Sequence, residues 1–356
     1  MEWKEVRLGD ILNFRRGHDL PHSAMKPGNI PVAGSNGVIG YHDTATPIKP
    51  ILTIGRSGNV GKPYFYEEAW AHNTTLYVDD FKGNDPKFLY YLCQTMPFAN
   101  FGGGSAVPTL NRNHIHPLET KIPVKVEDQR RIASILSSLD RKIELNNKIN
   151  ADLEEMAQAI FKNWFVDFEP FKDGKFVDSE LGMIPEGWKV GTLEDLITIK
   201  YGKDHKKLGD GTFPVYGSGG FMRFVNSWLY DGESVLIPRK GTLDNIMYVC
   251  EKFWTVDTMF FSVPKMDYVM KYVYNYIKRF DFSKMNEGTS VPSNTAARLN
   301  KMPILIPTHE ILEMYDETLC PVYNKRKMKD KESRTLSLLR DTLLPRLMSG
   351  ELEVPE

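Results

Sequence analysis

The chain carries the same order of sequence landmarks twice, and this repeat constrains its fold more than any other feature. Seven short motifs of the first half return in the second half, in the same order, at offsets of 183 to 185 positions. A repeat of this size corresponds to two whole domains and not to a solenoid unit. Two similar domains in one chain suggest pseudo-twofold symmetry, and therefore a partner with two similar sites. The paired landmarks are Trp3-Lys4 with Trp188-Lys189, Leu8 to Asp10 with Leu193 to Asp195, Arg16-Gly17 with Tyr201-Gly202, Pro31 to Ser35 with Pro214 to Ser218, Ile54 to Gly58 with Ile237 to Gly241, Gly104 to Thr109 with Gly288 to Ser293, and Ile122 to Val124 with the segment beginning at Ile306.

Composition places the chain among ordinary globular proteins. Its 356 residues are enough for two domains with cores of their own, and its apolar and charged fractions are 41% and 26%. No run is long enough to span a membrane, and the N-terminal apolar stretch is too short for a signal peptide. Cys93, Cys250 and Cys320 are too few and too scattered for a disulfide framework or a zinc site, so we expect a reducing, cytoplasmic compartment. With a net charge of −1, any DNA binding would depend on local patches.

Changes in composition divide the chain into four segments. Short apolar runs separated by Gly, Pro and Asn predict mixed structure in residues 1–125 and again in residues 176–308. Residues 126–175 are predicted to form a long helix and a linker, and residues 309–356 a second helical region. The predicted fold class is α+β, with two similar mixed α/β domains separated by two long, antiparallel coiled-coil regions. Within the first domain, Asp85 followed by Pro predicts a helix from Pro86 to Met96.

The first helical region has a heptad pattern. Residues 127–163 contain neither Pro nor Gly, and seam residues recur at alternating spacings of four and three. Such a helix would be about 55 Å long, which is typical of a spacer. Two Asn residues lie on the seam, where they could be buried to fix register or solvated at a thin part of the coil; both readings stay open. The predicted seam consists of Ile132, Leu136, Leu139, Ile143, Asn146, Asn150, Leu153, Ala157, Ile160 and Trp164.

The second helical region has a weaker seam, which begins at Ile311 and ends with Leu336, Leu339 and Leu343. Its middle is polar, and Pro321 predicts either a kink or the start of a new helix. The basic run of residues 325–334 is interrupted by acidic residues. This favours a solvated helix face over a DNA-binding patch.

The motifs of common enzyme classes are incomplete or absent. The segment GRSGNVGKP is similar to a phosphate-binding loop but has Arg56 and Pro63 where that motif requires Gly and Ser or Thr. The segment DFEPF is similar to the Asp-Pro-Pro-aromatic motif of adenine methyltransferases, but Glu169 replaces the first Pro. No glycine-rich dinucleotide motif, serine-hydrolase elbow or zinc-protease motif occurs. We therefore predict no catalytic residue, no metal site and no cofactor bound by this chain.

Polar loops at equivalent places of the two repeats are the candidate DNA-binding elements. GRSGNVGK and PRKGTLDN each follow an apolar, strand-like run. Arg56 or Arg239 could form two hydrogen bonds to guanine or hold a phosphate, and Gly allows close approach of the backbone. GSAVPT and GTSVPS offer amides and hydroxyls that suit phosphate contacts. A surface turn without a binding role stays an alternative for each pair. The candidate residues are Arg16, Ser35, Asn36, Arg56, Ser57, Asn59, Lys62, Asn73, Ser105, Thr109, Asn111 and Arg112 in the first repeat, and Lys203, Ser218, Arg239, Lys240, Thr242, Asn245, Thr289, Ser293 and Asn294 in the second.

Several segments together resemble the specificity subunit of type I DNA restriction-modification systems. They are WKEVRLGDI, PVAGSNGVIGYHD, GSAVPTLNRN, EDQRRIASILSSLDRKIELNN and LLPRLMSGEL, and the resemblance covers essentially the whole chain. It implies a non-catalytic subunit with two target-recognition domains. Each domain would read one half of a split sequence in double-stranded DNA, and the helices would set the gap between the halves.

The same resemblance implies partner subunits that carry out the chemistry. Two modification subunits would dock on the helices, bind S-adenosylmethionine and methylate adenine, and restriction subunits would cleave unmodified DNA with ATP and Mg²⁺. Because the loops of the two repeats differ, with Asn36 near Gly219 and Asn73 near Asp257 in the alignment, we expect an asymmetric target. Without partners, exposed apolar seams could lead to aggregation or a homodimer.

Three other functions stay open. The chain could be an orphan or silent specificity cassette that acts as a DNA-binding module, a stand-alone nuclease or methyltransferase with degenerate motifs, or a bivalent scaffold for proteins. Unaided catalysis by the purified chain would favour the enzyme, and a strong salt dependence of DNA affinity would argue against the protein scaffold.

Overall fold

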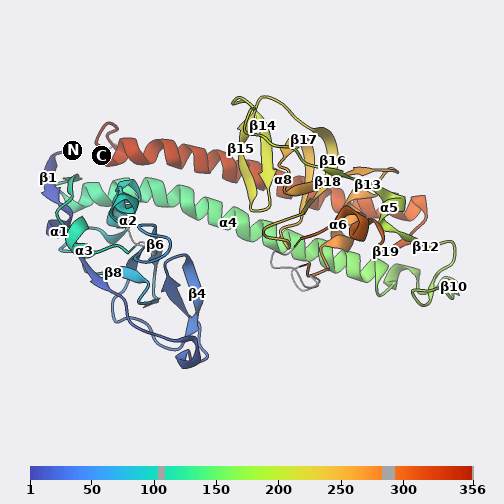
Figure 1. Cartoon of the computed structure of the whole chain (residues 1–356), viewed down its shortest axis with the longest axis horizontal. Coiled ribbons are helices and arrows are strands. Elements are labelled where there is room, and N and C mark those ends of the chain that lie inside the picture. The colour runs from blue at the N-terminus through green and yellow to red at the C-terminus, as the bar shows by residue number, and fades with distance from the viewer. Residues whose placement is uncertain (103–108, 283–292, 355–356) are drawn as a thin grey trace. The chain divides into compact units, whose positions relative to one another are not determined.

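The structure, a computed structural model, describes residues 1–102, 109–282 and 293–354 and contains two compact units (Figure 1). Unit 1 consists of Met1–Asn147 and Asp330–Glu356, and unit 2 consists of Lys148–Lys329. Two long helices, α4 (Val126–Phe165) and α8 (His309–Met348), contribute residues to both units. The compact units divide inside both helices, so they do not test where each mixed domain ends and each helical region begins. The boundaries expected at residues 125, 175 and 308 therefore stay predictions.

Unit 1 has short strands and short helices before α4. The first strand pairs with the last one ahead of α4, so the chain enters and leaves this part of the unit side by side. The elements are β1 (Trp3–Arg7), α1 (Leu8–Ile11), β2 (Asn13–Arg16), η1 (His22–Ala24), β3 (Ile30–Gly34), β4 (Gly37–His42), β5 (Ile51–Gly55), β6 (Pro63–Tyr66), β7 (Trp70–Ala71), β8 (Thr75–Asp80), α2 (Pro86–Thr95), η2 (Phe98–Phe101), α3 (Arg112–Ile115) and β9 (Glu119–Pro123).

Unit 2 largely repeats this order of elements before α8. A linker with a short 3-10 helix and two short strands precedes them. The elements are η3 (Glu169–Phe171), β10 (Phe176–Val177), β11 (Ile184–Pro185), β12 (Lys189–Thr192), α5 (Leu193–Leu196), β13 (Ile197–Tyr201), β14 (Phe213–Gly217), β15 (Gly220–Val225), β16 (Tyr230–Pro238), β17 (Met247–Thr255), β18 (Met259–Pro264), α6 (Met270–Ile277), α7 (Ala296–Asn300) and β19 (Pro303–Ile306).

The two units share one sheet topology. Unit 2 has a six-stranded sheet of order β13-β18-β16-β17-β14-β15, with α6 beside it (Figure 1). Unit 1 has the same order in two sheets, β2-β8-β5-β6 and β7-β3-β4, because β17 corresponds to two short strands, β6 and β7. β1 pairs with β9 and β12 pairs with β19 in the same antiparallel manner. This shared topology confirms the predicted α+β class and the repeated mixed domain.

One hairpin shows how closely the repeat is conserved. β3 and β4 pair with Pro31 opposite Tyr41, and β14 and β15 pair with Pro214 opposite Phe224. Both hairpins have a register shift at the same place, after Val32 in unit 1 and after Val215 in unit 2. A β-bulge of this kind bends the strand and increases its twist, so the two hairpins should have similar shapes.

Helix α2 begins where the sequence predicts. The Asp85 side chain accepts a hydrogen bond from the backbone N–H of Phe88 at 2.8 Å, and Pro86 occupies the first turn, where its missing N–H has no cost. The helix ends at Thr95, one residue before the predicted end. Its buried face packs in the core of unit 1.

Helices α4 and α8 are antiparallel within each unit. In unit 1 Arg340 of α8 donates to Asp140 of α4 at 2.9 Å, and Glu332 accepts from the amide of Asn146 at 3.1 Å. Residue numbers therefore decrease along α8 in the direction in which they increase along α4, as in an antiparallel pair. Asn146 is fully buried, so for this residue the structure supports a buried position on the seam over a solvated one.

The predicted seam of α8 is wrong at Leu339. Leu339 is 44% exposed, and its neighbour Arg340 takes the position opposite Asp140. Helix α8 also runs through Pro321 without restarting, because this Pro is exposed and water can solvate the carbonyl group that loses its N–H partner.

The basic run on α8 is only partly a solvated face, which corrects the sequence interpretation. Arg326 is largely buried in unit 2, where it forms an ion pair with Glu154 of α4 and lies over the rings of Tyr274 and Tyr323. Burial alone would lower the pKa of Arg326, but Tyr274 and Glu154 outweigh this effect and raise it. The Tyr274 hydroxyl donates to the same Glu154 at 2.9 Å. This group therefore fixes α6 to both long helices.

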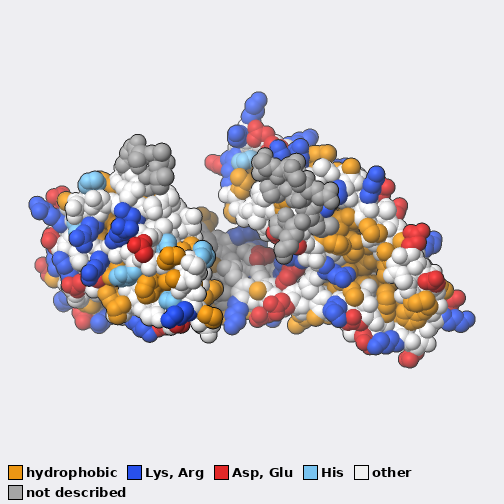
Figure 2. Space-filling model, turned by 60° about the horizontal axis from the view of Figure 1, so that its bottom comes forward, with side chains coloured by type: hydrophobic (Ala, Val, Ile, Leu, Met, Phe, Trp, Pro, Cys, Tyr) orange, Lys and Arg blue, Asp and Glu red, His pale blue; other side chains and the backbone are white. Residues whose placement is uncertain are grey.

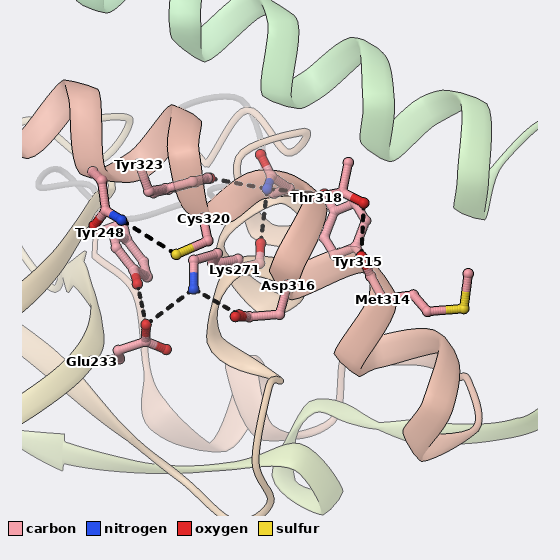
Figure 3. Close-up of polar contacts among 11 residues, drawn as sticks. Glu233, Tyr248, Lys271, Met314, Tyr315, Asp316, Thr318, Cys320 and Tyr323 are labelled. Carbon is pink, nitrogen blue, oxygen red and sulfur yellow. Dashed lines mark hydrogen bonds and ion pairs between the residues drawn. The ribbon is translucent and has the colours of Figure 1, made fainter.

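A second buried charge connects the sheet of unit 2 to α8 (Figure 3). The Lys271 ammonium of α6 lies 2.7 Å from the Asp316 carboxylate of α8 and 3.1 Å from the Glu233 carboxylate of β16. The Tyr248 hydroxyl donates to Glu233 at 2.6 Å. Lys271 is 4% exposed, so a single cation holds three elements together in a poorly solvated place.

Candidate nucleic-acid interface

The polar loops singled out by the sequence lie together in unit 1. The backbone N–H of Arg56 donates to the carbonyl group of Thr74 at 2.8 Å, and the N–H of Leu110 donates to the carbonyl group of Arg56 at 2.7 Å. Ser57 and Thr109 form an isolated antiparallel β-bridge. The loop that follows β5 is therefore fixed between the loop before β8 and the segment before α3.

Unit 2 repeats this arrangement bond for bond. The N–H of Arg239 donates to the carbonyl group of Thr258 at 2.8 Å, and the N–H of Asn294 donates to the carbonyl group of Arg239 at 3.0 Å. Lys240 and Ser293 form the matching β-bridge. The equivalence of the two loops, inferred from sequence position, therefore holds in the backbone hydrogen bonds.

The tip of a hairpin borders each of these loops. A Cβ atom built on Gly58 would lie 3.5 Å from the Ser35 hydroxyl, and one built on Gly241 would lie 2.6 Å from the Ser218 hydroxyl. Both glycines have positive φ, +84° and +87°, in the region that glycine tolerates best. The Asn245 amide also donates to the carbonyl group of Ser218 at 2.9 Å. In each unit we call the four segments the loop cluster: residues 35–36, 56–62, 72–74 and 109–112 in unit 1, and residues 218–219, 239–245, 256–258 and 293–296 in unit 2.

Arginines line a cavity in the loop cluster of unit 1. The cavity has a volume of about 380 Å³, and its wall includes Arg15, Arg16, Arg56 and Arg112. Arg15 lies 3.8 Å from Asp79, but in the described part of the chain no carboxylate lies within ion-pair distance of Arg16 or Arg56. Burial, and secondarily the charge of Arg16, lower the pKa of Arg56. The arginine pocket therefore holds like charges without a matching number of acids.

Such a pocket is suited to an anion. Bringing guanidinium groups together costs free energy that a phosphate or carboxylate would recover, and guanidinium binds either one through paired hydrogen bonds. Thr109 and Asn111 also line the cavity and offer further polar groups. On the face of unit 1 visible in Figure 2, at the left of the view, Lys and Arg side chains gather. A local basic patch of this kind can attract DNA despite a net charge of −1.

Unit 2 has different side chains at the same places. Tyr201 ends β13 as Arg16 ends β2, and Ala296 stands where unit 1 has Arg112. The Arg239 guanidinium lies 5.5 Å from the Tyr201 ring centroid, and Tyr201 is 55% exposed. An arginine over an exposed ring is held by about 0.5–1 kcal/mol. One guanidinium N–H of Arg239 donates to the carbonyl group of Asp257 at 3.4 Å, and the other nitrogens can still donate to a ligand. The two loop clusters therefore share a backbone and differ in chemistry.

The structure brings most of the candidate DNA-binding residues to the two loop clusters or to the strand ends beside them, but some have structural partners. Asn294 is buried, and its amide donates to the carbonyl group of Pro238 at 2.9 Å, so this residue supports the loop. Asn111 accepts the N–H of Asn113 and caps α3. The Asn73 amide donates to Asp19. Ser105 and Thr289 lie outside the described residues. The candidates that are partly or fully exposed are Arg16, Ser35, Asn36, Arg56, Ser57, Asn59, Lys62, Asn73, Thr109, Asn111, Arg112, Lys203, Ser218, Arg239, Lys240, Thr242, Asn245 and Ser293.

Sequence reasoning missed two residues of the candidate interface. Arg15 lines the arginine pocket, and Tyr201 stacks with Arg239. The alignment of the repeats places Tyr201 opposite Arg16, so it contained the signal for the second residue. The signal for Arg15 was its position beside Arg16 at the end of a strand-like run.

Neither a metal site nor a membrane span is found among the described residues. No group of three or more His, Cys, Asp or Glu side chains there could hold a metal ion. None of the described helices combines the length and the apolar character needed to cross a bilayer.

We expect the arginine pocket to contribute to the salt dependence of DNA binding. Arg16→Gln with Arg56→Gln should weaken duplex binding and should reduce the slope of log affinity against log salt by about two, because each phosphate contact contributes about one. Stability should not fall, since the substitutions remove like-charge repulsion. Binding is measured as a function of salt concentration, and unfolding by heat. Arg346→Gln, an exposed arginine of α8, serves as the control, and an unchanged slope in the double variant would contradict the prediction.

Comparison with known proteins identifies a family. The sequence profile described as "Type I restriction modification DNA specificity domain" matches residues 1–155 and 185–329, which is most of the chain. The specificity subunit of the type I restriction enzyme MjaIX from Methanocaldococcus jannaschii is 28% identical over 311 residues, which cover 76% of this chain and 70% of that protein. The specificity subunit of the type I restriction enzyme HindI from Haemophilus influenzae is 23% identical over 442 aligned positions, which cover 98% and 94% of the two chains.

A solved structure supports the fold. The crystal structure of the type I restriction-modification S subunit from M. genitalium superposes with a TM-score of 0.62, at 18% identity, over 98% of this chain and 96% of that one. At this identity the likeness concerns the fold. It agrees with the repeated mixed domains and long helices described above.

Proposed function

Because the chain belongs to the family of type I restriction-modification DNA specificity domains, we propose that it reads a bipartite, asymmetric sequence in double-stranded DNA. Each unit would bind one half of the target through its loop cluster. The chain itself would catalyse no reaction and would bind no cofactor.

The loop cluster, present once in each unit, is the observation that carries this proposal. The same backbone hydrogen bonds hold the loops of Arg56 and Arg239, so both units can present a guanidinium group in the same way. Arginine can bind guanine through two hydrogen bonds or hold a phosphate, and both contacts occur in DNA-reading proteins. Two equivalent sites in one chain suit a target with two separate halves.

The difference between the clusters carries the proposed asymmetry. Unit 1 has an arginine pocket, whereas unit 2 has Arg239 stacked on Tyr201 and Ala296 in place of Arg112. Different side chains on the same backbone should favour different bases. We therefore propose that the two half-sites differ in sequence and that the complete target is not palindromic.

The chemistry would belong to partner subunits. We propose that two modification subunits dock on α4 and α8, bind S-adenosylmethionine and methylate adenine in the target. Reaching adenine in a duplex requires extrusion of the base, which costs a few kcal/mol of stacking and pairing. Restriction subunits that use ATP and Mg²⁺ would join this complex to cleave unmodified DNA.

Mapping N6-methyladenine across the host genome, with this gene present and deleted, tests the proposal. We expect a split, asymmetric motif that is methylated only when the gene is present. A methylated palindrome would contradict the asymmetry. Unchanged methylation after deletion, together with no salt-dependent binding of duplex DNA by the purified chain, would overturn the function.

A further inference from the structure

Unit 2 exposes a pair of aromatic rings on one hairpin strand. Phe221 and Phe224 of β15 are 40% and 38% exposed, and their ring centroids lie 4.8 Å apart. Met222, between them in sequence, is exposed as well. We call β14 and β15, with these three side chains, the aromatic hairpin. A single exposed apolar residue is ordinary on a protein surface, whereas two exposed rings in contact form a larger apolar feature that a partner could cover.

The strand that carries these exposed rings lies at the edge of its sheet, where exposed apolar residues promote unwanted association. β15 is the last strand of the six-stranded sheet, and among the described residues no further strand pairs with its outer edge. An apolar edge strand promotes unwanted association, and proteins usually protect such strands with charges, prolines or a covering element. The β-bulge and the charge of Arg223 protect the backbone edge of this strand, but the two rings stay exposed, and a partner that covers them would remove them from water.

The aromatic hairpin is continuous with the loop cluster of unit 2. Its turn contains Ser218, whose carbonyl group accepts the Asn245 amide at 2.9 Å, and Phe221 lies three positions after Ser218. Asn245 and Arg239 belong to the same loop. A duplex bound at Arg239 would therefore extend toward the turn of the aromatic hairpin.

Positive charge borders the same strand. The Arg223 guanidinium of β15 donates to the carbonyl groups of His205 and Leu208 at 2.8 and 2.9 Å, which fixes the segment of residues 203–208 against the hairpin. Exposed Lys203, Lys206 and Lys207 lie on this segment. These three lysines, with one exposed carboxylate at Asp204, leave the segment beside the hairpin with a net positive charge. Such a charge matches the phosphates of DNA better than it matches a neutral edge strand of another protein.

We propose that Phe221 and Phe224 form a wedge that enters a base step of the half-site bound by unit 2 and unstacks it. The inference rests on the proposed DNA binding by unit 2. Apolar side chains, Phe among them, insert between base steps in several DNA-binding proteins and kink the duplex. The contact between the two rings orders them before binding, which reduces the entropy lost when DNA covers them.

Unit 1 lacks the ring pair at the equivalent positions. Val38 stands where unit 2 has Phe221, and Tyr41 stands where it has Phe224. Both side chains are exposed, but only one of them carries a ring. Unstacking should therefore be confined to the half of the target that unit 2 binds, and unit 1 provides an internal control.

The test uses the full chain and a 30-base-pair duplex that carries the target mapped by methylation. The adenines near each half-site are replaced one at a time by 2-aminopurine, whose fluorescence rises when its base is unstacked. Loss of one half of the motif in the Arg239→Gln variant identifies the half read by unit 2. We expect enhanced fluorescence at a step in that half and no enhancement in the other.

The Phe221→Ser, Phe224→Ser variant should lose the enhanced fluorescence and should bind about tenfold more weakly or worse, as expected for lost base–aromatic contacts. Its salt slope should stay unchanged, because no phosphate contact is removed. Phe221→Leu with Phe224→Leu should restore part of the signal, since Leu also acts as a wedge. Tyr41→Ser should leave the signal unchanged.

Several outcomes would overturn the wedge. A Ser variant with wild-type affinity and fluorescence would do so, as would weaker binding with the fluorescence retained, which indicates surface contact without insertion. Normal DNA binding combined with lost methylation would assign the aromatic hairpin to a protein partner instead. If the wild-type chain does not bind the mapped target, the proposed function fails, and the wedge with it. Because both rings lie at the surface, the variants should fold, and circular dichroism confirms this before binding is measured.

Discussion

Replacing Lys271 by Met should lower the free energy of unfolding by about 3 kcal/mol or more, a large fraction of the stability of an ordinary domain. The Lys271 ammonium is the cation that lies between the carboxylates of Glu233 and Asp316. Met keeps most of the apolar stem and removes the charge. The two carboxylates then repel each other in a poorly solvated place, and this uncompensated burial is the source of the loss.

A second substitution should recover much of the lost stability. Asp316→Leu combined with Lys271→Met removes the more buried of the two carboxylates together with the cation, and apolar replacement of a buried pair is often neutral. Glu233 is partly exposed and keeps the Tyr248 hydroxyl as a donor, so it can remain charged. Urea denaturation of the full chain measures both variants. A double variant no more stable than Lys271→Met would contradict this explanation.

Unit 1 offers a matched control at the equivalent position of the repeat. Lys87 lies on α2 as Lys271 lies on α6, but its ammonium lies over the rings of Phe65 and Tyr90. Lys87→Met should therefore cost about 1 kcal/mol or less. A loss as large as that of Lys271→Met would show that the position itself, and not the carboxylates, determines stability.

The pH dependence of this effect follows from the direction of the shift. Burial would lower the pKa of Lys271, but the hydrogen bond to Asp316 and the charge of Glu233 outweigh it and hold the pKa above the usual 10.5. A raised lysine pKa contributes stability that is complete below the unfolded value and is lost as the pH rises through the folded value. The difference between the wild type and Lys271→Met should therefore stay constant between about pH 7 and pH 9 and should shrink only in stronger alkali.

The sequence predicts the parts of the fold that are encoded locally or by repetition. Asp85 followed by Pro86 determines the start of α2, and the stretch without Pro or Gly predicts most of α4. The repeat also indicates that the loops of Arg56 and Arg239 are equivalent, and their backbone hydrogen bonds agree. These features depend on neighbouring residues or on self-comparison, so one sequence suffices to find them.

Features that depend on tertiary pairing were harder to predict. The predicted seam of α8 is wrong at Leu339 because Arg340 pairs with Asp140, a residue 200 positions away in the sequence. Arg326 looked like part of a solvated face, since nothing in the local sequence reveals Glu154 as its partner. The same limit applies to the interface, where the arginine pocket requires the pairing of β2 with β8. Periodicity locates an apolar seam, but it does not show which charges replace apolar residues within it.

Inserting one matched heptad into α4 and α8 should lengthen the gap between the two half-sites. Both helices contribute to both units, and the compact units divide between Asn147 and Lys148 in α4 and between Lys329 and Asp330 in α8. Seven residues add about 10 Å of helix, which corresponds to about three base pairs of duplex. A heptad also nearly preserves the rotational register of an antiparallel pair, with a drift of only about 20°.

We expect each half-site to keep its sequence, because the insertion leaves both loop clusters unchanged. The overall rate of methylation should fall, since three base pairs also rotate one half-site about the DNA axis by roughly a third of a turn. Methylation mapping in a host that carries only the altered gene measures both quantities. Two residues added to the exposed linker near Asp173 serve as the control and should leave the gap unchanged.

An insertion in α4 alone should abolish methylation. It would move Asp140 and Glu154 apart along one helix while Arg340 and Arg326 keep their separation on the other, so both ion pairs could not form together. The matched insertion restores both pairs and should therefore rescue methylation at the longer gap. A changed half-site with an unchanged gap would refute the proposal that the helices set the spacing. The matched variant could lose methylation although it folds and still binds each half-site separately. This outcome would indicate that the modification subunits no longer dock correctly on the longer helices.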